Sequence, residues 1–268
     1  MTEADGERGV GLPGTISQML IVAKYELLNL RRSRRFNLVL AMVISTSAVL
    51  TVVVGYYRPH SFLSSPLAFY GNWSGLSMLL ILTFVGVFLG GDSISSEFQS
   101  RTGYSMIGNP MSRAALYAGK FLAAFTASVL ALLAFEIIEG ANGLFYFGGR
   151  VPIQFFISSG LSIVAMLSIL GIAFFLSSLL KNGSLSMLIE TILLLLVFNL
   201  MAQVIEGLTR TQPWYDLSYA LQLLSAVLTP SWMSLASPSV FEGLAVMIGY
   251  FVACGIAGLV IFQRSELA

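Results

Sequence analysis

Six long apolar stretches alternate with short polar segments along the chain, and each stretch has the length of a membrane-spanning helix. Such a helix needs about 20 mostly apolar residues to cross the hydrocarbon core of a bilayer. The predicted spans cover residues 36–57, 73–91, 112–138, 152–180, 184–205 and 243–262. The second begins at Trp73, an aromatic residue of the kind that anchors helices at the membrane surface. The pattern predicts an all-α polytopic membrane protein with six transmembrane helices.

The segment before the first span has a different periodicity. Apolar residues recur there at spacings of three and four: Ile16, Met19, Leu20, Ala23, Leu27 and Leu30. This spacing predicts an amphipathic helix lying in the membrane interface. Four arginines follow it, and their simplest role is to anchor the chain and set its topology.

Residues 206–242, between the fifth and sixth spans, are too apolar for a solvated loop, and their longest apolar run is too short to cross the membrane. Prolines break the segment at Pro213, Pro230 and Pro238. We predict one or two short re-entrant helices here. The Gly86–Gly90 pair, and Gly249 with the alanines that follow it, are expected to let helices pack closely, within the monomer rather than between subunits.

Composition agrees with a single transmembrane domain, residues 15–268, after a polar tail, residues 1–14. Hydrophobic residues make up 56% of the chain and charged residues 10%, and the mean hydropathy is +0.85. The tail has no apolar core, so we expect no cleavable signal peptide. The net charge of +1 argues against nucleic acid as a partner.

The basic residues predict the orientation. Of the 14 lysines and arginines, only Arg58, Arg150 and Arg210 follow an odd-numbered span. The others lie on the side of the two termini, and short cytoplasmic loops are the basic ones. We therefore expect both termini in the cytoplasm.

Side chains that could support catalysis are few. The chain has one histidine, His60, and one cysteine, Cys254, which excludes a His/Cys metal cluster. The nearest fragment of a phosphate-binding loop is Gly119-Lys120, but Ala114 stands where the first glycine belongs and Phe121 follows the lysine. We expect no metal, no cofactor bound by this chain, and no ATP hydrolysis by it.

Acidic residues within the spans are candidates for a substrate route, because charge is costly at membrane depth. Glu190 lies about two turns into the fifth span, where it faces either a cavity or a neighbouring helix. Asn199 and Gln203 follow in the same span. Glu136 lies near the outer end of the third span, and Glu139 beyond it is expected to reach the interface and be solvated.

The segment between the second and third spans, residues 92–113, is the most sharply patterned polar stretch, and we call it the elbow. Residues 92–99 suit a helix, Gly108-Asn109-Pro110 is a strong turn signal, and Ser112 is a helix N-cap. Charged and apolar side chains alternate in it, as in a partner interface with an apolar centre and a polar rim. An ordinary well-capped loop is the alternative.

The elbow reads D-x-x-x-x-E-F-Q-x-R-T-G-Y-x-x-x-x-N-P-x-S-R, with Lys120 beyond it. This pattern resembles the signature of type-two permeases of ATP-binding-cassette (ABC) exporters, and the six-span plan extends the resemblance over nearly the whole chain. Many members read Gly-Thr where this chain reads Thr102-Gly103. The resemblance implies that the elbow is the coupling interface to the ATPase, with these residues: Asp92, Glu97, Phe98, Arg101, Thr102, Gly103, Pro110 and Arg113.

The resemblance implies a transmembrane subunit that works with two ABC ATPase subunits and a second permease copy or homologue. ATP and Mg²⁺ would be bound by the ATPases, and the expected location is a prokaryotic plasma membrane. An ion-coupled carrier or channel, or an intramembrane enzyme using Glu136 and Glu190, are the alternatives from other classes. Transport without ATP would favour the carrier, and turnover without an ATPase would favour the enzyme. The pattern does not identify the transported substrate.

Overall fold

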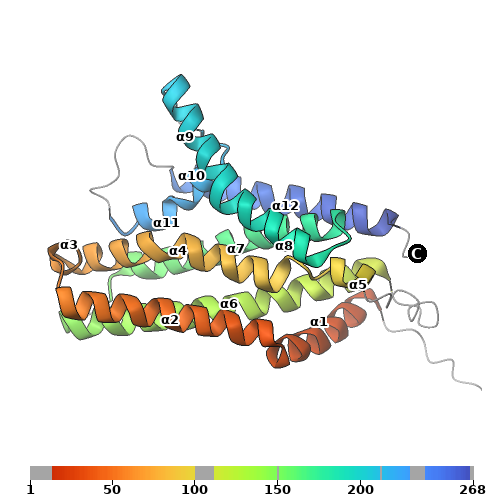
Figure 1. Ribbon diagram of the computed structural model, residues 1–268, viewed down its shortest axis with the longest axis horizontal. Helices are drawn as coiled ribbons and strands as arrows, with labels where there is room; N and C mark the ends of the chain where they lie inside the picture. The colour runs from red at the N-terminus through yellow and green to blue at the C-terminus, as the bar shows by residue number, and fades with distance from the viewer. Residues whose placement is uncertain (1–13, 100–111, 150, 212, 230–238, 266–268) are drawn as a thin grey trace, which may run out of the picture.

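The computed structural model describes residues 14–99, 112–149, 151–211, 213–229 and 239–265, and the regular elements in these ranges are all helices (Figure 1). They are α1 (Thr15–Arg32), α2 (Arg34–Tyr57), α3 (His60–Leu63), α4 (Pro66–Gly90), α5 (Ser95–Gln99), α6 (Arg113–Phe147), α7 (Ile153–Leu179), α8 (Gly183–Ile192), the π-helical η2 (Leu193–Val197), α9 (Phe198–Thr209), α10 (Leu217–Leu221), α11 (Leu223–Ala226) and α12 (Val240–Arg264). Six candidate membrane spans lie in the described residues, formed by α2, α4 with α5, α6, α7, α8 with η2 and α9, and α12. The predicted all-α, six-span architecture is confirmed.

The start of the second span and the end of the third differ most from the prediction, and local capping explains both. α4 begins at Pro66 because the Ser65 hydroxyl accepts a hydrogen bond from the Ala68 amide at 3.1 Å. Trp73 therefore lies two turns inside the helix and is fully buried, so the prediction of an interfacial anchor was wrong. α6 continues to Phe147 and ends at Gly148, whose φ of +57° suits a glycine C-cap. Glu139 is consequently buried rather than solvated.

α4 and α7 are the most buried spans, and they pack against one another, with α2 and α6 against α4 and with α12 and α8 against α7 (Figure 1). Gly86 and Gly90 make the α4–α7 contact possible. A Cβ on Gly90 would lie 2.7 Å from a methyl of Leu170 and 3.0 Å from the Cβ of Ala173. The predicted packing of these glycines within the monomer is confirmed. Gly249 behaves differently, because a Cβ added there would meet nothing within 4 Å.

α1 packs along α6, and the two helices are in close contact at Gly119. A Cβ on Gly119 would lie 2.7 Å from the Met19 carbonyl oxygen and 2.6 Å from the Cβ of Val22. The outward side of α1 carries exposed apolar residues: Ile16, Leu20, Ile21, Tyr25 and Leu28. The helix is present where it was predicted, and its position in the membrane interface stays a prediction.

The fifth span is interrupted. α8 passes into the π-helical turn η2 and then into α9, which leaves the bundle at an angle (Figure 1). The short helices α10 and α11 follow, in the segment where short helices were predicted. Whether they dip into the membrane stays a prediction.

Polar contacts bring the start of α1, the start of α6 and the end of α12 to one end of the bundle. The Ser112 amide donates to Oε1 of Gln18 at 3.1 Å. Nη1 of Arg113 donates to the carbonyl oxygens of Gln263 at 2.9 Å and Ser265 at 2.8 Å. The elbow lies at this same end.

Candidate functional site

The described part of the elbow consists of residues 92–99 and 112–113. A turn begins at Gly91 and α5 follows it, so the helix in residues 92–99 is shorter than predicted. The Ser112 hydroxyl accepts from the Ala115 amide at 3.2 Å, which confirms the predicted N-cap of the third span. The other predicted coupling residues, Arg101, Thr102, Gly103 and Pro110, lie outside the described residues.

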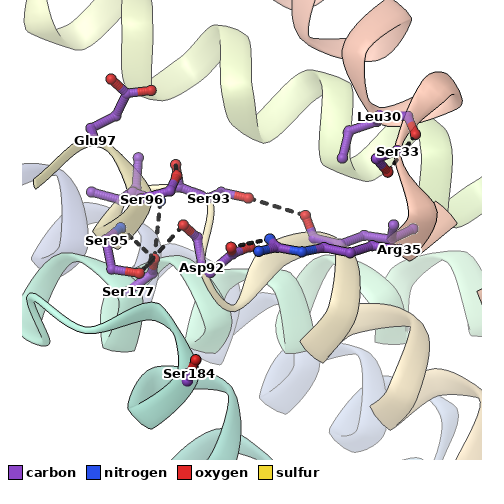
Figure 2. A network of polar contacts seen from close by, with 12 residues as sticks. Leu30, Ser33, Arg35, Asp92, Ser93, Ser95, Ser96, Glu97, Ser177 and Ser184 are labelled. Carbon is purple, nitrogen blue, oxygen red and sulfur yellow. Dashed lines mark hydrogen bonds and ion pairs between the residues drawn. The ribbon is translucent and has the colours of Figure 1, made fainter. Parts of the chain in front are cut away.

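Asp92 fastens the start of the elbow to α2. Its side chain is 8% exposed and forms an ion pair with Nη1 of Arg35, whose side chain is 48% exposed. Figure 2 shows Arg35 on one side of Asp92, with Ser95 and Ser177 on the other. Ser33 fixes the start of α2, and with it the place of Arg35 in the first turn, because its hydroxyl accepts a hydrogen bond from the Phe36 amide at 3.2 Å.

Lys120 of α6 fastens the other end of the described segment. Its ammonium group lies 2.7 Å from Oε1 of Glu97 and 3.5 Å from Oε1 of Glu26 in α1. It also donates to the carbonyl oxygen of Ser93 at 3.1 Å. The Lys120 side chain is 6% exposed, and a lysine at this depth is ordinarily paired. One cation therefore joins the elbow to both α6 and α1.

Ser177 of α7 completes the backbone hydrogen bonding of the turn. Its hydroxyl oxygen accepts from the amides of Ile94 and Ser95, each at 3.0 Å, and its hydroxyl lies 3.3 Å from that of Ser95. These two amides lie at the start of α5, where helix amides lack partners within the helix. All three residues are fully buried, so the turn is held firmly against α7.

Phe98 and Arg113 connect the elbow to α12. The Phe98 ring packs edge-on against Phe262, with ring centroids 6.1 Å apart. Phe262 also contacts Tyr117 of α6, at 6.1 Å. Together with the Arg113 contacts to the end of α12, these rings make the last span a further support of the elbow.

The fifth span also touches the elbow, which the sequence reasoning missed. A Cβ on Gly183, the first residue of α8, would lie 2.8 Å from the Cβ of Asp92. A Cβ on Gly91 would lie 2.6 Å from Oε2 of Glu190 and 2.9 Å from Cγ of Met187. The small residues at 91 and 183 are the only signal in the sequence, and they indicate close packing without identifying the partner.

The four predicted substrate-route residues do not form one cluster. Glu190 is fully buried between α8 and α4, and its carboxyl oxygens have no hydrogen-bond partner within the described chain. Glu136 is buried between α6 and α7 and accepts from the Ser162 hydroxyl at 2.7 Å. Gln203 is exposed on α9. Their role in transport stays a prediction.

Asn199 lines a cavity of about 140 Å³ between α4 and α9–α11. The polar lining residues are Ser74, Asn199, Ser218, Gln222 and Ser225. Ser74 also donates to Oε1 of the buried Glu139 at 2.8 Å. This cavity lies in the half of the bundle remote from the elbow, and it is large enough for a few water molecules.

The described residues contain no group of three or more His, Cys, Asp or Glu side chains placed to hold a metal ion. The described site is a set of ion pairs and hydrogen bonds that joins the elbow to the neighbouring helices.

Comparison with known proteins connects these features to a family. A family model described as "ABC-2 family transporter protein" matches residues 22–199, well over half of the chain. The match includes most of α1, the elbow, and the spans from α2 to α8. A comparison with curated proteins found no match.

Proposed function

We propose that this chain, which belongs to the ABC-2 family of transporter proteins, receives movement from ATPase subunits at its elbow and exports a substrate. As a member of that family it is a transmembrane subunit of an ABC transporter. The export direction, the coupling through the elbow and the composition of the complex are the proposed parts.

The proposal rests on the contacts that the elbow makes with the neighbouring helices. Within eight residues, 92–99, the elbow contacts α2 through Asp92, Lys120 of α6 through Glu97, and α7 through the Ser95 amide. Lys120 in turn pairs with Glu26 of α1. Phe98 contacts Phe262 of α12. Gly91, directly before this segment, packs closely against α8. A partner that displaces this segment must therefore displace the ends of several helices at once.

ATP binding would close two ATPase subunits together and push the elbow. The chain responds if the ATP-bound partners bind one arrangement of the spans more tightly than the other, because only differential affinity shifts a conformational equilibrium. The contact between Gly91 and Glu190 would pass the shift to α8, and from there to η2 and α9. ATP and Mg²⁺ remain with the ATPases in this scheme.

The proposed substrate route follows the fifth span, with Glu190, Asn199 and Gln203 along it, and includes Glu136, which lies apart from that span between α6 and α7. The complex would contain two ATPases and a second permease copy or homologue. It would lie in a prokaryotic plasma membrane, with the elbow and both termini in the cytoplasm.

The test replaces Glu97 by Gln in proteoliposomes that contain the chain and the ATPase that co-purifies with it. Glu97→Gln keeps the shape of the side chain but removes its charge, so Lys120 loses its closest negatively charged partner. A hydrogen bond to a charged group contributes about 1.5–3 kcal/mol. We therefore expect stimulation of the ATPase by the permease to fall about tenfold or more, while the two proteins still co-purify.

The matched control is Glu206→Gln, because Glu206 is an exposed glutamate near the end of α9, far along the chain from the elbow. It should leave stimulation unchanged. Unchanged stimulation in Glu97→Gln would refute the coupling role of the elbow. Transport by the isolated chain without an ATPase would refute the proposed energy source.

A further inference from the structure

An aromatic groove opens on α12 at the end of the bundle opposite to the elbow. It has a volume of about 380 Å³ and is lined by Trp214, Tyr215, Phe241, Glu242, Ala245, Val246, Gly249 and Tyr250. The loop before α10 supplies Trp214 and Tyr215, and the first three turns of α12 supply the rest. Nothing in the coupling scheme uses this surface.

Small residues of α12 form the open part of the groove. Gly249 is exposed, and a Cβ built on it meets nothing within 4 Å. Ala245, one turn earlier on the same face, is also exposed. The sequence predicts a packing contact for Gly249, but the structure places no helix of the described chain against it. The space stays open because these side chains are small.

The walls of the groove are aromatic rings, and several of them are exposed. Trp214 is 63% exposed and Phe241 81% exposed. The rings of Trp214 and Tyr215 pack edge to face, with centroids 5.7 Å apart. The ring of Tyr250 is supported from behind by Phe198, at 5.8 Å. Aromatic faces attract cations through their quadrupole, and rings arranged around one space are the usual receptor for quaternary ammonium groups.

Glu242 gives the groove its charge. Its Oε2 accepts from the Ser239 amide at 3.0 Å in a capping box, which fixes the carboxylate at the first turn of α12. None of the described residues that line the groove is a lysine or an arginine. The surface therefore combines one fixed negative charge with four rings, and it has no cation to receive an anion.

We propose that this groove binds an organic ammonium cation that carries apolar substituents. The ammonium group lies among the ring faces near Glu242, and the apolar part lies over Ala245 and Gly249. The choline headgroup of a lipid has the same cation but is tethered to a phosphate. Glu242 repels that phosphate and no lysine or arginine lines the groove to balance its charge, so the ligand is a free cation.

This inference does not depend on coupling through the elbow, and it is tested without the ATPase. The purified chain in a neutral maltoside detergent is titrated with choline and with its uncharged carbon isostere, 3,3-dimethylbutan-1-ol, and binding is followed by ligand-observed NMR. We expect choline to bind about tenfold more tightly than the isostere, in line with cation–π attraction at a partly desolvated site. Equal affinities would overturn the proposal and leave only a hydrophobic surface.

Two variants locate the binding site. Glu242→Gln removes the charge but retains the capping box, because glutamine also serves at that position, so the preference for choline should fall severalfold with the fold intact. Gly249→Leu fills the groove from an open position and should abolish binding of both probes. Unchanged binding in either variant would overturn the proposal.

The matched controls are Glu206→Gln, an exposed acid outside the groove, and Gly160→Leu, whose position on α7 is also open within 4 Å. Both should bind the probes as the wild type does. Two further outcomes would contradict the proposal. One is loss of choline binding in phosphatidylcholine nanodiscs but not in phosphatidylglycerol nanodiscs, which assigns the groove to lipid headgroups. The other is a dimer that Gly249→Leu dissociates, which assigns the groove to a second copy of the chain.

Discussion

Gly91 separates the second span from the elbow at a point with no room for a side chain. A methyl group there would approach Oε2 of Glu190 to 2.6 Å and the carbonyl oxygen of Val87 to 2.7 Å. Either the elbow or α8 must shift to accommodate it. Overpacking of this kind costs about 1–3 kcal/mol, so Gly91→Ala should destabilise the protein by that amount when unfolding is titrated in mixed detergent micelles.

Two companion variants make the test specific. Gly160→Ala also adds a methyl group within a helix, but into open space, so it should be neutral or stabilise by up to about 1 kcal/mol. Glu190→Ala removes the carboxyl group that Gly91→Ala would meet, and the double variant should recover part of the loss. Strict additivity of the two changes would show that residues 91 and 190 do not interact.

At the residue scale the motif included both members of the Glu97–Lys120 pair, but for the other contacts it identified one side only. Asp92, Glu97, Phe98 and Arg113 stood out because they are polar or aromatic residues in a strongly apolar chain. The partners in these other contacts did not, because Ser177 is one serine among many and lies 82 residues beyond Ser95. A pairing over such a distance depends on how α4 and α7 pack, and no local pattern encodes it.

Among the elements, the fifth span is the least regular. In η2 the backbone follows a π-helical path, and Nδ2 of Asn199 donates to the carbonyl oxygens of Leu194 and Leu195, each at 3.2 Å. π-turns within α-helices are often found at functional sites. Asn199→Ala removes both hydrogen bonds, so amide hydrogen exchange over 193–199 should become about fivefold to tenfold faster, given a net value of about 1 kcal/mol for such a bond.

Asn142 provides the comparison for this experiment. Its Nδ2 donates to the carbonyl oxygen of Ile138 at 2.9 Å within the regular helix α6. That carbonyl already has its helical partner, so Asn142→Ala should leave exchange in α6 nearly unchanged. An equal effect in both helices would mean that Asn199 has no special role in the π-turn.

Hydrophobic run length was sufficient to predict the six spans, but not where α4 begins or where α6 ends. The cap at Ser65 lies in a polar segment that resembles a loop, and α6 continues through the mixed sequence before Gly148. The π-turn was not predictable, because residues 193–197 are uniformly apolar and an apolar run has the same appearance in either helix type. Glu139 was predicted to be solvated because the third span was expected to end at residue 138, whereas α6 continues to Phe147.

At the scale of the whole molecule, the predicted orientation in the membrane can be tested directly. The starts of α1 and α6, the end of α12 and the elbow share one end, and the basic residues predict that this end is cytoplasmic. In a Cys254→Ser background, Gly14→Cys should react with a membrane-impermeant maleimide only after cells are permeabilised. Gly149→Cys, beyond the far end of α6, should react in intact cells.

Both glycines are exposed, and Cys254 is the one native cysteine, so labelling reports the introduced site alone. Cys254→Ser by itself should not label and serves as the blank. The reverse pattern, with residue 14 reactive in intact cells, would place the elbow outside the cell and exclude an ATPase as its partner.

The length of α6 has a mechanical consequence. Its 35 residues form a rod of about 52 Å at 1.5 Å per residue, whereas the hydrocarbon slab measures about 30 Å. Such a helix must tilt or extend beyond the hydrocarbon core, and its tilt angle changes with the thickness of that core. Lys120 is about two turns from one tip, so leaning displaces the ammonium that holds Glu97. The length of the lipid acyl chains therefore affects the position of the elbow directly, without any ligand.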